Sequence, residues 1–366
     1  MMCKSMEDYI KVYLETDVLL LADSFEDFRK TTMMNFHLDP CKFLSTPHVA
    51  FNAMLKMTGI EIQLLPEIDM INFIKAGIRG GVASIMHRYA EANLPNEPGY
   101  NPEKPRGEIL YVDVCNLYGY ALSRPLPVGD FRWMSQREVD CFDVSNIPHN
   151  SRIGFIVECD LTYPEHLHDA HNDFPLAAEK MVVQKSEWSP YMQKLATENG
   201  IGKNYRGVEK LIPHLGPRKH YVTHYLNLAY YIKQGMKLEK IHRILSFSQS
   251  AFMRPYIDFC TRLREKTNNE FQSNLCKLFC NAVYGKLLQN PSHNVNMKLV
   301  TTSHQFHKLS RKPNFKSMTI YNKHLAGIEM KPLSLMMNKP LQIGMVCLEE
   351  AKRHLLKFHY SFMKGM

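Results

Sequence analysis

A short apolar stretch that ends in a carboxylate is the first feature of this sequence with chemical potential. Glu108–Asp113 predicts a strand, and such a strand delivers the carboxylate of Asp113 to the edge of a sheet. A carboxylate held there binds Mg²⁺ well when a second carboxylate faces it. Tyr118 follows closely and is positioned to pack under the sugar of a nucleotide. The alternative is a turn in which Asp113 and Asn116 cap backbone N–H groups.

A second group of residues shares one stripe of a predicted helix. Lys277, Asn281, Tyr284 and Gly285 recur at helical spacing. The stripe offers a cation for a triphosphate, an amide for hydrogen bonding and an aromatic plane for a base pair. Gly285 allows another backbone to approach closely. The alternative is an ordinary amphipathic helix with a solvated lysine, although packing alone explains such a stripe poorly.

A third group consists of Tyr13 and Asp17, which lie four residues apart on a predicted helix. Residues at this spacing share one face, so a hydroxyl and a carboxylate can converge on one metal-bound water. The spacing is common by chance, and a core tyrosine beside a surface aspartate is the alternative.

The elements that must position these groups follow from hydrophobic periodicity. Apolar residues at three- and four-residue steps predict a helix from about Asp8 to Lys30 and a further helical stretch over 68–74. A helix from about Thr46 to Met57 ends at Gly59, a common stop signal. Residues 94–107, rich in Pro, Asn and Gly, predict a surface loop.

The second half of the chain contains segments with the two-residue period of strands and segments with the 3.6-residue period of helices. Ile153–Asp160 predicts a strand, whereas residues 237–289 have helical character with dense Lys and Arg. Leu341–Val346 predicts a strand followed by a helix. This pattern of helices, strands and long loops indicates an α+β fold.

Composition narrows the class of protein. The chain has 366 residues, and 45 Lys and Arg against 36 Asp and Glu leave a net charge of +9, which suits a polyanionic partner without requiring one. The nine cysteines include no C-x-x-C pair, which favours reduced thiols over zinc ligands or a disulfide framework. The longest strongly apolar stretch, Val18–Ala22, falls far short of the roughly 18–20 residues of a membrane span, and no signal or transit peptide is evident.

The three groups, in this order and with these gaps, resemble the motifs of family B DNA polymerases of the protein-primed branch. Tyr13 and Asp17 match the Y-x-x-x-D exonuclease motif, and Asp113, Leu117 and Tyr118 match polymerase motif A, D-x-x-x-L-Y. The stripe from Lys277 to Gly285 matches motif B, K-x-x-x-N-x-x-Y-G. The segments Tyr163–Asp169 and Asn172–Leu176 are similar to the polymerases of large self-synthesising transposons of the Polinton/Maverick type.

The resemblance implies roles for these residues. Asp113 and the carbonyl of Val114 would bind Mg²⁺, and Asp17 would bind metal at the exonuclease site, with Tyr13 beside it. Tyr118 would exclude a ribose 2′-OH. Lys277 would hold the incoming triphosphate, Asn281 would help seat the nucleotide, and Tyr284 would support the nascent base pair.

Three further positions are assigned by the same resemblance or by their neighbourhood. Arg264 and Lys266 precede Lys277 by two to three helical turns and could add phosphate contacts, although basic residues on helices are usually just solvated. Gly80 and Gly81 fall where the family has its Y-x-G-G template-strand motif, and Gly285 would also approach DNA. Ile78 replaces the expected tyrosine, so only the two glycines transfer.

The implied architecture is a right-hand palm and fingers with the tail of a 3′–5′ exonuclease domain. The expected segments are the end of the exonuclease domain (1–75), a linker with the first palm segment (76–130), an insertion between motifs A and B (131–235), the fingers helices (236–290) and a return to the palm (291–366). In protein-primed relatives the insertion grips the priming protein and DNA. Its cluster His166, His168, Asp169 and His171 resembles a metal site, but such polar loops are usually solvated.

One absence limits the functional prediction. Family B polymerases carry a second metal-binding carboxylate in motif C, usually Y-x-D-T-D, and no Asp-x-Asp occurs in this sequence. The chain therefore resembles an internal piece of a polymerase gene, expected to show little polymerase or exonuclease activity alone. The predicted function is a DNA-directed DNA polymerase that uses dNTPs and primer–template DNA, with a terminal protein as a further candidate partner and the nucleus as the expected compartment.

Two alternatives remain open at this point. One is a catalytically inactive, nucleic-acid-binding remnant of such a polymerase, which holds DNA by phosphate contacts. The other is a reverse transcriptase or another palm-type enzyme, which is disfavoured because no Y-x-D-D is present.

Overall fold

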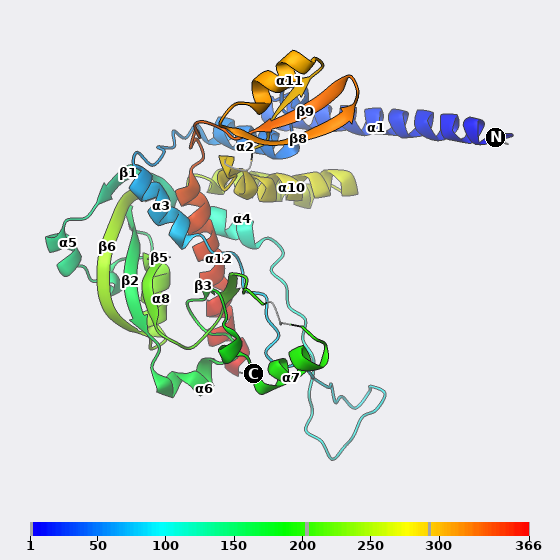
Figure 1. The fold of residues 1–366 in the computed structure, drawn as a ribbon. Helices are drawn as coiled ribbons and strands as arrows, with labels where there is room; N and C mark the ends of the chain where they lie inside the picture. Colours follow the sequence, from blue (N-terminus) through cyan, green and yellow to red (C-terminus); the bar gives the residue numbers. More distant parts are fainter. Residues whose placement is uncertain (1–2, 202–204, 292–293, 366) are drawn as a thin grey trace.

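The computed structural model describes residues 3–201, 205–291 and 294–365. Helices and strands are mixed along the chain, and the described strands pair antiparallel, as in an α+β fold (Figure 1). None of the described helices combines the length and the apolar character needed to cross a membrane. The first three helices are α1 (Met6–Phe36), α2 (Thr46–Thr58) and α3 (Ile68–Gly77).

The first two helices end where local chemistry allows. Ser5 and Asp8 form a capping box at the start of α1, and His37 ends the helix in the left-handed conformation. Gly59 ends α2 at φ 62°, as predicted from the sequence. The N-terminal half of α1 projects away from the body of the molecule in Figure 1, and only its C-terminal part packs, with Phe28 and Phe36 against Phe279.

A four-stranded antiparallel sheet in the order β1-β6-β2-β5 forms the centre of the molecule. Its strands are β1 (Leu126–Trp133), β2 (Ile153–Thr162), β5 (Arg218–His224) and β6 (Lys237–Ser250). Adjacent residues of a strand point to opposite faces. Ile156 and Val157 are both buried and belong to two different core clusters, so the sheet separates two cores.

The sequence prediction was wrong for residues 237–250, which form β6 and not a helix. Charges at the start of this segment imitate a helix surface. Ile244 and Leu245 are nonetheless buried on opposite sides of the sheet. Pairing with both β1 and β2 outweighs the local pattern, because long-range ladders and two-sided burial decide strand formation.

Helix α12 (Leu341–Ser361) joins the two cores. The predicted strand over 341–346 is wrong, because these residues form the first turns of this helix. Ile343, Met345 and Val346 are all fully buried, and a helix that is apolar on every side is a buried helix. Its N-terminal part packs with α3 and with the helix α10 (Glu270–Leu287), whereas Leu356 belongs to the core on the other face of the sheet.

Two further helices pair beside α2 and form the wall next to α12. They are α9 (Arg254–Lys266) and α10 (Glu270–Leu287). The buried Tyr256 hydroxyl donates to the Phe279 carbonyl at 3.2 Å and ties the two helices together. The helical prediction for this part of the chain is confirmed.

The remaining elements are short or peripheral. They are α4 (Leu117–Leu122), α5 (Gln136–Asp140), α6 (His168–His171), α7 (Pro190–Glu198), α8 (Tyr225–Lys233), β3 (Glu179–Met181) and β4 (Lys210–Ile212). A small separate unit contains β7 (Asn296–Val300), α11 (Ser303–Ser310), β8 (Phe315–Asn322) and β9 (Leu325–Met330).

Candidate functional site

The segment around Asp113 has no regular secondary structure, and it leads into the capped start of helix α4. Asn116 caps α4: its side-chain oxygen accepts from the Gly119 N–H at 3.1 Å. A methyl group on Gly119 would collide with the Asn116 amide, so the glycine is required by the cap. The capping role that was the alternative for Asn116 is therefore present, and it also orients Tyr118 at the start of α4.

Residues 108–113 are not a strand, which corrects the sequence prediction. They run as exposed coil, with Tyr111 94% exposed. A strand needs a neighbour to pair with, and no described strand lies beside this segment. Asp113 is exposed and Val114 half-buried, and the Asp113 carboxylate makes no hydrogen bond or ion pair with another described residue.

The stacked rings of Tyr118 and Tyr284 join motif A to motif B. Their centroids lie 4.3 Å apart and their planes differ by 7°. Burial, followed by the neighbouring Tyr118, raises the pKa of Tyr284, so this phenol stays neutral at physiological pH. Two residues predicted to hold one nucleotide therefore form one aromatic platform.

Helix α10 presents the rest of the predicted stripe. Lys277 is exposed, and its ammonium group forms no ion pair with the described residues. Asn281 is half-buried one turn further along, and Gly285 is exposed. A Cβ at Gly285 would meet no atom within 4 Å, so packing within the described residues does not require a glycine here. The unpaired ammonium group of Lys277, the amide of Asn281 and the bare backbone of Gly285 therefore lie along one side of α10, beside Tyr284.

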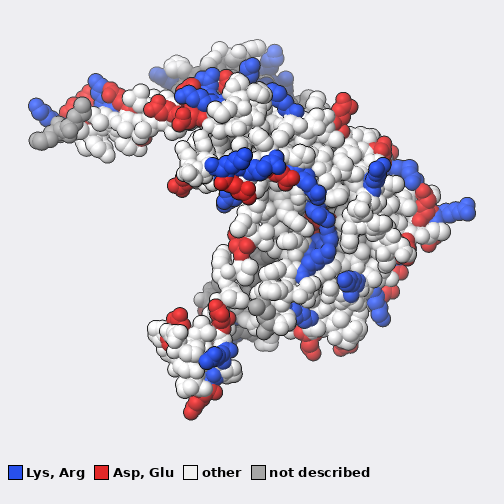
Figure 2. Space-filling model, turned by 180° about the vertical axis from the view of Figure 1, so that it is seen from behind, with Lys and Arg blue, Asp and Glu red and all other residues white. Residues whose placement is uncertain are grey.

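Arg264 lies close to this stripe, and Lys266 is exposed at the end of the same helix. The hydrogen bond with Cys260 and, after it, the positive charge of Arg264 lower the pKa of Cys280, so Arg264 acts electrostatically on α10. Lys266 forms no contact that ties it to α10 among the described residues. Figure 2 shows Lys and Arg side chains as a band across this face of the molecule, at the level of α10 and below α1.

A cavity of about 390 Å³ opens at the C-terminal end of α10, where Lys286, the residue after Gly285, is part of its lining. Lys286 and Lys339 line it. Burial and, after it, the charge of Lys286 lower the pKa of Lys339, so the two ammonium groups repel each other. A cavity of this charge attracts phosphate.

Gly80 and Gly81 follow α3 and are exposed. Neither has a positive φ, and a Cβ on either would meet nothing within 4 Å. The preceding residue, Arg79, was missed by the sequence analysis. It is buried, donates to the Val222 carbonyl at 2.7 Å and lies over the Tyr221 ring at 3.8 Å. Arg79 therefore fastens the glycine pair to β5.

A buried ionic network on α12 was also missed, because its partners lie on β5 and α8, far from Glu349 in the sequence. Glu349 accepts from the Thr223 hydroxyl at 2.6 Å, from Asn227 at 3.1 Å and from Lys352 at 2.9 Å. Burial alone would raise its pKa, but the charges of Lys352 and Arg79 together with the hydrogen bonds lower it to about 2. The carboxylate is ionised and fixes α12 to β5 and α8.

Tyr13 and Asp17 share one face of α1, as predicted, but far from the other motifs. Tyr13 is 54% exposed and stacks only on Tyr9, with centroids 6.3 Å apart. Asp17 is exposed and forms no ion pair among the described residues. The structure therefore does not bring this pair together with Asp113 or Lys277.

The donors available for a metal ion are few. The described residues contain no group of three or more His, Cys, Asp or Glu side chains able to hold a metal ion. Asp113 and the Val114 carbonyl alone do not fit a two-metal site. Two residues of the histidine cluster before β3 lie on α6 and bond to Tyr163: His171 is buried against the Tyr163 hydroxyl at 2.7 Å, and His168 lies 3.3 Å from the Tyr163 carbonyl.

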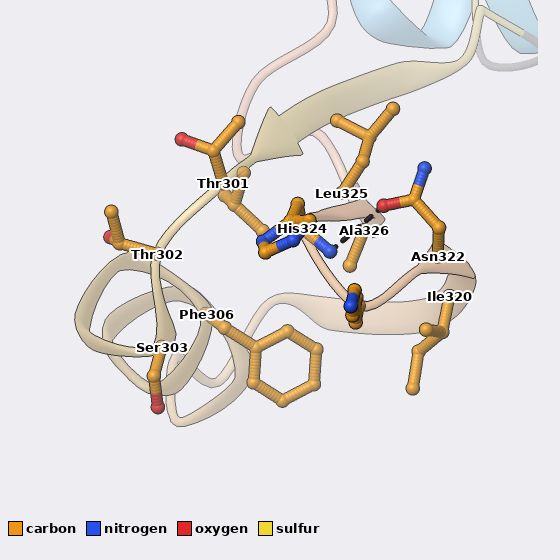
Figure 3. A pocket seen from close by; sticks show the side chains of 11 residues that line it. Thr301, Thr302, Ser303, Phe306, Ile320, Asn322, His324, Leu325 and Ala326 are labelled. Atoms are coloured by element: carbon orange, nitrogen blue, oxygen red, sulfur yellow. Dashed lines mark hydrogen bonds between the residues drawn. The ribbon is translucent and has the colours of Figure 1, made fainter.

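The small unit of β7–β9 contains a cavity of about 260 Å³, drawn in Figure 3. Phe306 lines it, and the His324 N–H donates to the Asn322 side chain at 2.8 Å in the turn between β8 and β9. None of the residues lining it is acidic, and none belongs to the predicted site. This cavity is therefore separate from the motif A and motif B residues.

Comparison with known proteins identifies the fold and the family. Residues 4–339 match the family model of DNA polymerase type B, organellar and viral. No curated protein matches the chain. The phi29 DNA polymerase in an orthorhombic crystal form has the same fold, with a TM-score of 0.55 and 12% identity over 98% of this chain and 51% of that chain.

A second phi29 DNA polymerase structure, complexed with primer–template DNA, gives a TM-score of 0.51 and 13% identity over 94% of this chain and 48% of that chain. The chain thus spans about half the length of these polymerases. The family match covers motifs A and B together with the helix of the exonuclease motif. The chain belongs to the organellar and viral family of type B DNA polymerases.

Proposed function

We propose that this chain binds an incoming dNTP and primer–template DNA for template-directed nucleotidyl transfer. The observation that supports the proposal is the stack of Tyr118 on Tyr284, which brings these two side chains together from distant parts of the chain. Lys277 would bind the triphosphate, since its exposed ammonium group is unpaired among the described residues. Asn281 would hydrogen-bond the nucleotide, and Tyr118 would pack against its sugar.

DNA contact is proposed for the glycines. Gly80, Gly81 and Gly285 are exposed, have no positive φ and face open space where a side chain would stand. Nothing in the described fold requires glycine at these positions, whereas a nucleic-acid backbone that approaches closely does. The basic band beside α10 supplies the phosphate attraction, with Arg264 and Lys266 as candidate contacts (Figure 2).

Mg²⁺ is the cofactor that the family uses, and Asp113 with the Val114 carbonyl is this chain's contribution to its ligands. A polymerase site needs a second carboxylate, and the described residues contain no group of three or more His, Cys, Asp or Glu side chains that could complete a metal site at Asp113. We therefore expect nucleotide and DNA binding by this chain without appreciable primer extension. The exonuclease roles of Tyr13 and Asp17, with Asp17 as metal ligand, stay proposals on the same footing.

The test is binding of labelled dATP to the chain with primer–template DNA and Mg²⁺. Lys277→Ala should weaken dATP binding at least tenfold, and Asp113→Ala should remove the gain that Mg²⁺ gives. Lys308→Ala on α11 removes an exposed lysine elsewhere and is the matched control. Equal weakening in all three variants would refute the proposed site.

The second candidate function is a nucleic-acid-binding remnant without nucleotide affinity. The exposed, unpaired carboxylate of Asp113 favours it. Salt-sensitive DNA affinity with no dATP binding would identify this function. Robust Mg²⁺-dependent extension, abolished in Asp113→Ala, would instead show a complete polymerase site.

The finer assignments rest on the sequence resemblance. We propose an origin in a self-synthesising transposon of the Polinton/Maverick type, action in the nucleus, and contact between residues 131–235 and a terminal priming protein. Terminal inverted repeats in the DNA that flanks the gene would support the origin. Residues 131–235 used as bait should capture a protein that is covalently attached to DNA, and this result would support the proposed partner. The proposed division of the chain is 1–75, 76–130, 131–235, 236–290 and 291–366.

A further inference from the structure

A cavity of about 580 Å³ lies between α8, the short turn Val144–Asn146 and the C-terminal half of α12. Its volume falls in the range of small-molecule sites. Leu226, Ala229 and Ile232 provide an apolar wall from α8. Arg353 and Lys357 face them from α12.

The lining is strongly basic. Lys233, Arg353 and Lys357 contribute three cations, and no acidic residue lines the cavity. Burial and then the charges of Arg353 and Lys233 lower the pKa of Lys357. The same order of causes, burial followed by Arg353 and Lys357, lowers the pKa of His149 at the rim. Cations crowded in this way repel one another, and an anion bound among them relieves that repulsion.

The buried cation of this cavity, Arg353, has a hydrogen-bond donor without an acceptor. Arg353 is 4% exposed and donates to Glu350 at 2.5 Å, but its Nε has no hydrogen-bond partner among the described residues. A buried donor without an acceptor is costly. Glu350 also lies 3.9 Å from Arg124, so this one carboxylate is shared between two guanidinium groups. The three cations of the lining thus retain a net positive charge.

The cavity is distant from the motif B stripe. Helix α12 passes α10 at Gly344, which packs against Leu288. Arg353 lies nine residues further along the same helix, which is roughly 14 Å at 1.5 Å per residue. Lys357 lies another turn beyond. The cavity is therefore a second site, and its argument does not depend on the function proposed above.

We propose that this cavity binds a phosphate-bearing small molecule of nucleotide size. Its phosphate lies among Lys233, Lys357 and Arg353, and its uncharged part lies against the apolar wall of α8. Arg353 is almost completely buried, which favours a small molecule over the backbone of a duplex, because a duplex stays at the surface. A terminal phosphate also carries nearly two charges at neutral pH, more than a backbone diester.

The test is calorimetric titration of the full chain with deoxyadenosine monophosphate, without divalent metal and at fixed low ionic strength. Deoxyadenosine, which lacks the phosphate, should bind at least tenfold more weakly. Lys233→Gln combined with Lys357→Gln should weaken binding of the monophosphate at least tenfold. Both lysines are exposed, so these variants should fold, and thermal unfolding checks this.

Two controls make the outcome decisive. Lys308→Gln combined with Lys312→Gln removes the same charge from an exposed surface elsewhere and should leave binding unchanged. Absence of saturable binding, or equal weakening in the charge control, would overturn the proposal. Displacement of the monophosphate by an oligonucleotide without terminal phosphates would assign the cavity to DNA and overturn it as well.

Discussion

The rings of Tyr118 and Tyr284 lie parallel within 7° at a centroid distance of 4.3 Å, although they come from distant parts of the chain. Tyr118 stands at the start of α4, two residues after the N-cap Asn116. Tyr284 lies two turns from Lys277 on α10. The stack therefore fixes how the Asp113 segment and the lysine stand relative to each other.

A double-mutant cycle should measure this coupling. Tyr118→Leu and Tyr284→Leu are each expected to destabilise the chain, and their joint effect should fall short of the sum by about 0.5–1.5 kcal/mol, the typical worth of an aromatic pair. Urea unfolding of the four proteins provides the values. The stacked pair Tyr9 and Tyr13 on the exposed half of α1 is the matched control, because its rings lie 6.3 Å apart. A coupling no larger than that of the control would contradict a role for the Tyr118–Tyr284 stack.

The sequence was a good guide to the site where spacing along one helix decides the geometry. Lys277, Asn281 and Gly285 share a face because the helical period dictates it, and this prediction is confirmed. The sequence analysis did not predict the contact of Tyr118 with Tyr284, because no local pattern could place the two rings together. Arg79 and Glu349 were missed, because their roles depend on partners from β5 and α8 that are distant in sequence.

The fold was predictable where local signals agree with burial. Gly59 ends α2 because a left-handed cap favours glycine. The prediction failed at β6 and at the start of α12, where two-sided burial makes strands and helices look alike. Residues 108–113 show the converse: their apolar pattern predicts a strand, but the described residues offer it no partner.

Loss of the Glu349 carboxylate should be costly. Glu349→Gln leaves Lys352 and Arg79 without their buried counter-charge, and removal of one partner of a buried pair typically costs roughly 3–5 kcal/mol. Urea unfolding at pH 7 measures the loss. Glu198→Gln removes an exposed partner of Lys194 and should change the free energy of unfolding by less than about 1 kcal/mol. Similar values for the two variants would show that the network does not hold α12 in place.

The same carboxylate predicts an acid dependence. The pKa of Glu349 is lowered from 4.5 to about 2 in the folded chain, so its contribution is complete above pH 4.5 and is lost as the pH falls toward 2. The wild-type chain should lose more stability than Glu349→Gln over this interval. Chemical unfolding at several pH values gives the free energy of unfolding of the two proteins. Their difference removes the contribution of the other carboxylates, which both proteins share. Parallel curves would contradict the lowered pKa.

The buried His224 predicts a second pH range, above that of Glu349, in which the stability of the chain depends on pH. Burial lowers the pKa of His224 from 6.5 to about 4, and neither ring nitrogen has a hydrogen-bond partner among the described residues. The folded state favours the neutral ring, so stability is complete above pH 6.5 and falls as the pH drops toward 4. Glu349, Glu350 and Arg353 are the charged groups that act on this ring. His224→Leu should flatten the pH dependence over this interval, and an unchanged slope would argue against it.

Two glycine substitutions should separate stability from ligand binding. Gly285→Ala fills open space within α10 and should stabilise the helix by about 0.5–1 kcal/mol, because alanine restricts the unfolded chain. It should nevertheless weaken affinity for primer–template DNA, since the added methyl group stands where the backbone is bare.

Gly77→Ala is the matched comparison at the end of α3. Its Cβ would collide with the Met345 side chain and lie 3.1 Å from Val222, so it should destabilise the chain by about 1–3 kcal/mol. DNA affinity of the folded fraction should stay unchanged, because this methyl group is buried. Thermal unfolding and DNA titration of both variants give the two readouts. A Gly285→Ala chain that binds DNA as tightly as the wild type would show that nucleic acid does not approach α10 at this position.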